Sequence, residues 1–291
     1  MSVKALIFDL YGTLIRIHTD EESIEHLWKP LSYFYGYHGA YYTPEALLDS
    51  YRHLIAKEER KAQKKYKTEA AEIKLERVFK ELFTLKGAKV SSQTVLYTAQ
   101  FFRACSTKVS ELYPGVQDMF YRLKQQGIQI YLLSNAQRIF TEPEMKRLGI
   151  YESFDEVFIS SDWNFKKPSP TYFGYLLDKI PFSPKEIMMV GNSPRDDIVP
   201  AYALGLQTCF LNTDGVKEIP PFTFDDDGNV TSYLGFEKRR DPETRTTYNH
   251  PVIVKVAVRQ TARVPVEIQQ LLKPDPTIPT PEPVRPPLYE K

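Results

Sequence analysis

Short runs of apolar residues alternate with amphipathic segments over two parts of the chain. The first run, Ala5-Leu6-Ile7-Phe8, leads directly into Asp9. Four similar runs lie at residues 128–133, 154–159, 187–190 and 208–211, and segments with helical spacing lie at residues 115–127, 139–148, 169–180 and 198–204. Buried strands that alternate with amphipathic helices are typical of a parallel sheet. We therefore predict an α/β fold with a doubly wound, Rossmann-like core formed by residues 1–15 and 108–214.

Residues 16–107 show a different pattern, because their apolar residues recur only at helical spacing. The clearest stripe contains Leu47, Leu48, Tyr51, Leu54 and Ile55. Thr19 precedes three acidic residues, a combination that is typical of a helix N-cap followed by its first turn. We therefore predict an all-helical insertion after the first strand of the core.

The pattern changes again beyond Asp214. Asp227-Gly228 is a hairpin turn signal, and the valines between residues 252 and 258 alternate as in a half-buried strand. We predict a small antiparallel β addition over residues 215–273. The proline-rich residues 274–291 predict an extended tail, which serves as a spacer or offers Pro283-Val284-Arg285-Pro286 to a protein partner.

Composition and charge exclude several classes of protein. The chain has 38 basic and 37 acidic residues, so its net charge of +1 argues against a protein that coats nucleic acid or an anionic membrane. The two cysteines, Cys105 and Cys209, match no metal-binding spacing and indicate a reducing compartment. No signal peptide and no apolar run of membrane-spanning length is visible in the sequence. We expect a cytoplasmic protein with a small-molecule substrate.

Polar residues lie at the ends of four of the predicted strands or in the loops that follow them. They are Asp9, Ser134, Lys167 and the loop over residues 192–197. Each has a structural explanation by itself, since Ser134 could cap a helix and Lys167 could lie at the surface. Together they would share one edge of the sheet, where ligands bind. A carboxylate nucleophile, a hydroxyl donor, a fixed cation and further carboxylates describe a covalent-aspartate mechanism for an anionic substrate.

Four motifs in these places resemble those of the haloacid dehalogenase superfamily of hydrolases. They are Asp9-Leu10-Tyr11-Gly12-Thr13, Leu133-Ser134-Asn135, Lys167-Pro168-Ser169-Pro170, and Val190-Gly191-Asn192-Ser193 with Asp196 and Asp197 after it. Their order and spacing agree with the superfamily over about residues 1–213, and residues 215–291 lie outside the resemblance. The resemblance implies that the helical insertion is a mobile cap over the site.

The resemblance also implies a role for each motif residue. Asp9, Ser134, Lys167 and Asp197 are expected to be catalytic, with Asp9 as the nucleophile and with Ser134 and Lys167 as anchors for the substrate anion. Tyr11, Gly12, Thr13 and Asn135 are expected to contact the substrate. Asp9, Tyr11 through its carbonyl, Asn192 and Asp197 are expected to hold Mg²⁺.

Two residues depart from the pattern of the superfamily's phosphatases. Tyr11 replaces the aspartate that protonates the leaving alkoxide and later activates water. A tyrosine is a poor base at neutral pH, and general acid-base help contributes about 10²- to 10⁴-fold to a rate. Asn192 replaces a metal-binding aspartate, so Mg²⁺ affinity should fall unless Asp196 or Asp197 compensates.

Three functions therefore stay open at the level of the sequence. The first is a Mg²⁺-dependent phosphatase that acts on a small phosphorylated metabolite through Asp9. The second is a metal-free hydrolase of carbon-halogen bonds, similar to the 2-haloacid dehalogenases, in which Arg16 or Arg52 would hold the halide. The third is a non-catalytic homologue that only binds a ligand.

Overall fold

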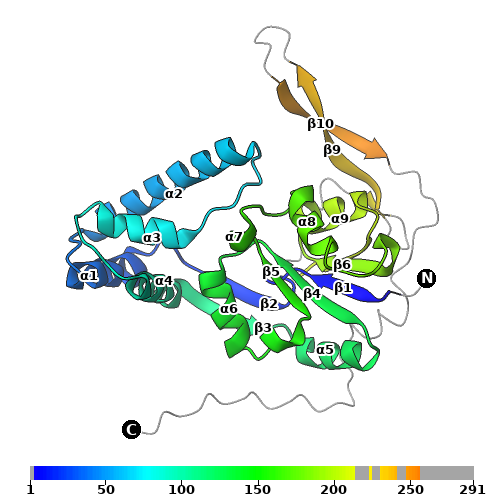
Figure 1. Cartoon of the computed structure of the whole chain (residues 1–291), viewed down its shortest axis with the longest axis horizontal. Coiled ribbons are helices and arrows are strands. Elements are labelled where there is room, and N and C mark those ends of the chain that lie inside the picture. The colour runs from blue at the N-terminus through cyan, green and yellow to red at the C-terminus, as the bar shows by residue number, and fades with distance from the viewer. Residues whose placement is uncertain (1–2, 214–222, 225–229, 241–246, 256–291) are drawn as a thin grey trace.

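The core of the protein is a five-stranded parallel sheet (Figure 1). The computed structural model describes residues 3–213, 223–224, 230–240 and 247–255. The strands of the sheet are β1 (Ala5–Phe8), β4 (Gln129–Ser134), β5 (Glu156–Ile159), β6 (Ile187–Gly191) and β7 (Gln207–Phe210), in the order β5-β4-β1-β6-β7. The order reverses at β1, so the carboxyl ends of β1 and β6 flank the crevice where ligands bind in such sheets. The predicted doubly wound α/β fold is confirmed.

Helices cover both faces of this sheet. They are α5 (Val116–Gln125), α6 (Arg138–Arg147), α7 (Ser160–Trp163), α8 (Pro170–Leu177) and α9 (Val199–Ala203), with short turns η2 (Tyr151–Ser153), η3 (Pro184–Glu186) and η4 (Pro194–Ile198). Successive residues of β1 point to opposite faces, as the pleat of a strand requires. Phe8 packs edge-on against Phe120 of α5 in one layer, whereas Ile7 lies in the other layer with Phe173 of α8. The sheet is thus buried on both sides, which explains its continuous apolar runs.

A helical insertion separates β1 from α5. It contains the turn η1 (Ile24–Trp28) and the helices α1 (Lys29–Tyr37), α2 (Pro44–Tyr66), α3 (Leu75–Thr84) and α4 (Ser92–Ser106). The rings of Trp28, Phe79 and Phe102 pack together in its own apolar core. Figure 1 shows these helices as a separate group beside the sheet.

A two-stranded antiparallel ribbon carries this insertion. Its strands, β2 (Ile15–Thr19) and β3 (Thr107–Leu112), pair with each other at the two ends of the insertion. The expectation of helices alone in this region, with Thr19 as an N-cap, is therefore wrong. Thr19 ends β2, and Ser23 instead caps η1 by accepting a hydrogen bond from the amide of His26 at 3.2 Å. The pairing joins segments about 90 residues apart in the sequence, so local periodicity does not reveal it.

The described residues at 223–224, 230–240 and 247–255 form a further sheet, which is antiparallel. Its strands are β8 (Thr223–Phe224), β9 (Val230–Arg240) and β10 (Thr247–Lys255), in the order β10-β9-β8. The predicted turn at Asp227-Gly228 and the proline-rich tail lie outside the described residues. Within the parts of the chain that the structure describes, no helix is both long enough and apolar enough to cross a membrane.

Candidate active site

Asp9 lies at the carboxyl end of β1, in the centre of the sheet. Its amide donates a hydrogen bond to the carbonyl of Val190 on β6 at 2.9 Å, which fixes the backbone there. Asp9 is 7% exposed, and its carboxylate is held from two sides. Asp9 Oδ1 lies 2.7 Å from Lys167 Nζ, and Asp9 Oδ2 accepts a hydrogen bond from Thr13 Oγ1 at 2.9 Å. The side chain is therefore oriented before any substrate arrives.

The loop after β1 comes unusually close to the loop after β6. Gly12 has a φ of +83°, and a Cβ atom at this position would lie 2.2 Å from Asn192 Nδ2. Only glycine combines this backbone conformation with so close an approach. Thr13 Oγ1 also lies 3.3 Å from Asn192 Oδ1. Gly12 therefore leaves room for the amide of Asn192, which Thr13 Oγ1 links to the Asp9 carboxylate.

Lys167 connects Asp9 to Asp197. Its side chain is buried, and its Nζ lies 2.7 Å from Asp9 Oδ1 and 2.7 Å from Asp197 Oδ1. Burial acts to lower the pKa of Lys167, but the carboxylates of Asp197 and Asp9 raise it above its ordinary value overall. Lys167 thus stays protonated at neutral pH and presents a fixed positive charge to the site.

Asp197 is almost completely buried at the start of the helical segment after β6. Burial raises the pKa of Asp197 to about 6, even though Lys167 acts to lower it. Asp197 Oδ2 accepts a hydrogen bond from the amide of Ser193 at 2.9 Å. A Cβ atom at Gly191 would lie 2.3 Å from this oxygen, so the glycine leaves room for the carboxylate.

Ser134 ends β4, Asn135 follows it, and the two side chains have different surroundings. The Ser134 hydroxyl oxygen is buried and has no hydrogen-bond partner among the residues that the structure describes. A buried hydroxyl normally has a partner, so this one is available to a ligand. Asn135 holds Lys167 instead: its Nδ2 donates to the Lys167 carbonyl at 2.9 Å, and its Oδ1 accepts from the Lys167 amide at 2.7 Å. The structure therefore places Asn135 where it positions the lysine.

Tyr11 turns away from Asp9 toward α6. Its hydroxyl donates a hydrogen bond to Glu144 Oε2 at 2.6 Å and lies 3.1 Å from Thr141 Oγ1. Burial, with a further contribution from Glu144, raises the pKa of Tyr11 well above its ordinary value. Tyr11 therefore stays protonated at neutral pH and is unsuited to act as a base.

The arginine beside Tyr11 is one that the sequence analysis missed. Arg103, near the end of α4, lies with its guanidinium 5.7 Å from the Tyr11 ring centroid and donates to Glu144 Oε1 at 2.6 Å. The two arginines considered from the sequence pair elsewhere, Arg16 with Glu111 and Arg52 with Glu22, and both are about half exposed. Arg103 and Glu144 are 41 residues apart and belong to no motif, so no local signal in the sequence indicates them.

A loop of the helical insertion docks on the segment that precedes Lys167. The Lys166 amide donates to the Ala70 carbonyl at 2.9 Å, and the Glu72 amide donates to the Asn164 carbonyl at 2.9 Å. Between these bonds, Ala71 and Phe165 form an antiparallel bridge. The insertion thus contacts the same segment that delivers the lysine to the site.

The Glu72 carboxylate anchors this contact and makes its stability depend on pH. It accepts a hydrogen bond from Ser160 Oγ at 2.6 Å, and burial raises the pKa of Glu72 above its ordinary value of 4.5. The folded state then binds a proton more tightly than the unfolded state, so the free energy of unfolding should fall as pH rises from about 4.5 through the raised pKa.

We expect Glu72→Gln to remove this part of the pH dependence, because glutamine does not titrate. Thermal unfolding at several pH values between about 4 and 8 measures it. Glu69→Gln, at an exposed position of the same loop, is the control and should keep the wild-type slope. Equal slopes for wild type and Glu72→Gln would contradict the prediction.

Known proteins resemble this chain in sequence. A family model described as haloacid dehalogenase-like hydrolase matches residues 3–205. The phosphoglycolate phosphatase of Aliivibrio fischeri is 26% identical over 225 residues, which span 76% of this chain and 88% of that enzyme. The phosphoglycolate phosphatase of Vibrio cholerae is 29% identical over 137 residues, which span 45% of this chain and 60% of that enzyme. Several of the curated relatives are thus matched over only about half of their length.

The solved structures show the same fold at lower identity. The 2-haloacid dehalogenase of Pseudomonas syringae superposes with a TM-score of 0.55 at 19% identity, over 75% of this chain and 90% of that one. The HAD phosphatase of Thermococcus onnurineus superposes with a TM-score of 0.50 at 20% identity, also over 75% and 90%. Both a dehalogenase and a phosphatase share this fold, so the fold does not distinguish the two reactions.

Proposed function

This chain belongs to the haloacid dehalogenase-like hydrolases, and from that premise we propose that it hydrolyses phosphoric monoesters of small metabolites through a phosphoryl intermediate on Asp9. One observation carries the proposal: the Asp9 carboxylate is held between Lys167 Nζ and Thr13 Oγ1 at the end of β1. The neighbouring strand β4 ends in Ser134, whose buried hydroxyl has no hydrogen-bond partner among the described residues. The phosphatase names of its relatives support the same reaction.

The proposed chemistry uses each of these groups in a defined role. Asp9 attacks phosphorus, so that a bond from its carboxylate oxygen to phosphorus forms while the bond to the leaving alkoxide breaks, and the alkoxide takes its proton from solvent water. Lys167 stabilises the negative charge on the phosphoryl oxygens, and the Ser134 hydroxyl donates a hydrogen bond to one of them. Water then hydrolyses the acyl phosphate and regenerates Asp9.

The proton of the attacking water requires a base other than Tyr11. Tyr11 is held in the protonated form by its burial and by Glu144. Asp197 lies across Lys167 from Asp9, and a pKa of about 6 leaves it mostly ionised at neutral pH. For these reasons we propose that Asp197 is the base that accepts the proton of the attacking water.

Oxygen atoms converge beside Asp9 in a way that fits Mg²⁺. Asp9 Oδ2 and Asn192 Oδ1 both contact Thr13 Oγ1, at 2.9 and 3.3 Å. Carboxylate and amide oxygens are ligands that Mg²⁺ accepts, and it commonly completes its shell with substrate phosphate and water. The described residues contain no group of three or more acidic, histidine or cysteine side chains that could hold a metal alone. We therefore infer a weak site that depends on bound substrate.

Asp9, Asn192 and the carbonyl of Tyr11 would hold the ion in this proposal. Asp197, also expected as a ligand from the sequence, contacts Lys167 and the amide of Ser193 in the structure. When bound, Mg²⁺ would neutralise charge on the transferred phosphoryl group.

Asn192→Asp should strengthen Mg²⁺ binding by about tenfold or more, because it adds a second carboxylate beside Asp9. The measurement is the Mg²⁺ concentration that gives half-maximal hydrolysis of p-nitrophenyl phosphate. Gln93→Glu adds the same charge at an exposed position of α4 and serves as the control. If Asn192→Asp left the half-maximal Mg²⁺ concentration unchanged, the ion would bind away from residue 192.

A mixed substrate panel tests the proposed reaction against its main alternative. We expect hydrolysis of p-nitrophenyl phosphate that requires Mg²⁺, and no chloride release from 2-chloropropionate. Metal-free chloride release would establish the dehalogenase instead, although Arg16 and Arg52, the arginines considered for the halide, are paired with acids at the surface. The absence of turnover on both classes, together with ligand binding, would indicate a non-catalytic homologue.

A further inference from the structure

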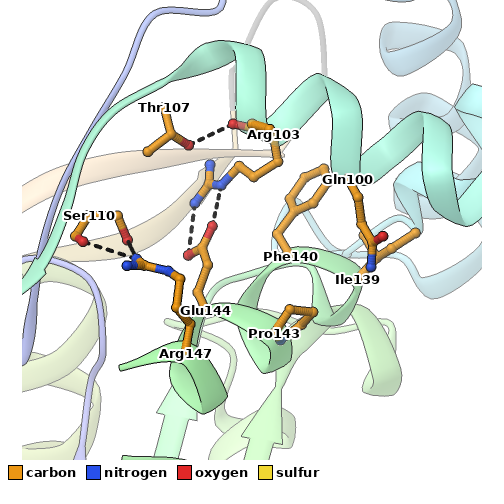
Figure 2. Close-up of a pocket in the computed structure, with 10 residues that line it drawn as sticks. Gln100, Arg103, Thr107, Ser110, Ile139, Phe140, Pro143, Glu144 and Arg147 are labelled. Carbon is orange, nitrogen blue, oxygen red and sulfur yellow. Dashed lines mark hydrogen bonds and ion pairs between the residues drawn. The ribbon is translucent and has the colours of Figure 1, made fainter. Parts of the chain in front are cut away.

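A cavity lies where the helical insertion joins the core. It has a volume of about 520 Å³ and lies between α4, β3 and α6. Figure 2 shows its lining, with the side chains of Arg103 and Arg147 at one end, that of Gln100 at the other and the ring of Phe140 between them. Asp9 and Lys167 are not among the residues that line it, so it is distinct from the site described above.

The polar end of this cavity has a net positive charge. Arg147 is exposed, and its Nη2 donates to Ser110 Oγ at 2.7 Å and to the Ser110 carbonyl at 3.0 Å. Neither partner is charged, and no acidic side chain of the described residues forms an ion pair with Arg147. Arg103 does pair with Glu144, at 2.6 Å. Two guanidinium groups and one carboxylate leave a charge of +1 in the lining.

The rest of the cavity is mainly apolar, with Gln100 and Thr107 as its polar residues. Ala104 and Pro143 are exposed into it, and Phe140 lies beneath the Arg103 guanidinium at 5.3 Å from its ring centroid. A volume of about 300 to 1,000 Å³, with a mainly apolar lining and a few polar groups, is typical of small-molecule sites.

We propose that this cavity binds a small organic monocarboxylate with an apolar body. The planar guanidinium of Arg147 matches a carboxylate through two parallel hydrogen bonds. The apolar body would cover Ala104, Phe140 and Pro143. A dianion such as a phosphate monoester is disfavoured, because Glu144 lies in the same lining and would repel the second charge.

Glu144 connects the cavity to the active site. It accepts a hydrogen bond from Tyr11 on one side and from Arg103 on the other. A bound carboxylate would compete with Glu144 for Arg103 and so change how Tyr11 is held. We expect binding to change kcat without competing with substrate, and this part alone rests on the proposed phosphatase activity.

Calorimetric titration of the full chain with benzoate tests the binding. Benzamide, which has the same shape without the charge, should bind at least about tenfold more weakly, and so should acetate, which lacks the apolar body. Arg147→Gln should weaken benzoate about tenfold, and Ala104→Phe should abolish binding because it fills the cavity. Asp9→Asn should leave benzoate binding unchanged.

Several results would overturn the proposal. They are the absence of saturable benzoate binding up to about 10 mM, binding that persists in both Arg147→Gln and Ala104→Phe, and binding that inorganic phosphate displaces. Arg147→Gln alters an exposed side chain, so it keeps the test valid if Ala104→Phe does not fold. Because the titration needs no turnover, a failure of the proposed phosphatase activity would be seen separately.

Discussion

Asp9→Asn is expected to reduce hydrolysis of p-nitrophenyl phosphate by about 10⁴-fold or more, because removal of a covalent nucleophile leaves only the binding contribution of the site. The amide of asparagine cannot form the phosphoryl intermediate. It can still accept a hydrogen bond from Lys167 or Thr13, so the geometry of the loop should be retained.

The same change should not destabilise the fold. In the wild type, the single charge of Lys167 faces the carboxylates of both Asp9 and Asp197. Asp9→Asn leaves one cation with one anion, which removes a repulsion between two buried carboxylates. We therefore expect a melting temperature equal to or above that of the wild type.

Turnover and thermal unfolding, measured on the same preparation, check both parts of this prediction. Asp178→Asn changes an exposed aspartate on the same sheet domain and should keep wild-type activity. If Asp9→Asn retained activity within tenfold of the wild type, Asp9 would not be the nucleophile. Lost activity together with a lower melting temperature would instead assign it a structural role.

The strands and the order of motifs could be predicted because their signals are local. Each buried strand is a short apolar run, and Asp9 and Ser134 each stand at the end of one. Parallel strands place such ends at one edge of a sheet, whatever their separation in the sequence. This is why the structure brings Lys167 within 2.7 Å of Asp9, although 158 residues separate them.

Contacts between distant segments outside the motifs could not be predicted in this way. The ribbon of β2 and β3, the pairing of Arg103 with Glu144, and the contact of Glu72 with Ser160 each join distant segments. Arginine, glutamate and serine are common in solvated helices and loops, so the residue types of these pairs give no signal in the sequence. Their partners become visible only when the insertion is placed against the core.

The role of Tyr11 shows how this limit affects a functional interpretation. From the sequence, the tyrosine is a replacement for an acid, with a side chain that would face the substrate. In the structure, its hydroxyl is satisfied by Glu144 and Thr141, on the helix that follows Ser134. The residue thus links the nucleophile loop to α6, whose Glu144 also pairs with Arg103 of the insertion, and its proton is not free for catalysis.

Lys167→Met should have the second largest effect, on both stability and activity. The change leaves Asp9 and Asp197 buried without their cation, and removal of one partner from a buried ion pair costs about 3 to 5 kcal/mol. The loss of a fixed positive charge at the phosphoryl group should reduce kcat by about 10²- to 10³-fold.

A double variant separates the two effects. Adding Asp197→Asn to Lys167→Met removes one of the unpaired carboxylates, so part of the stability should return, while activity should not, because no cation is restored and the proposed base is removed as well. Lys166→Met, at the neighbouring position, is the control and should retain activity. Denaturant unfolding and p-nitrophenyl phosphate turnover of the four proteins provide the measurements. If the double variant recovers activity along with stability, Lys167 acts by holding the fold and the charge it presents to the substrate is dispensable.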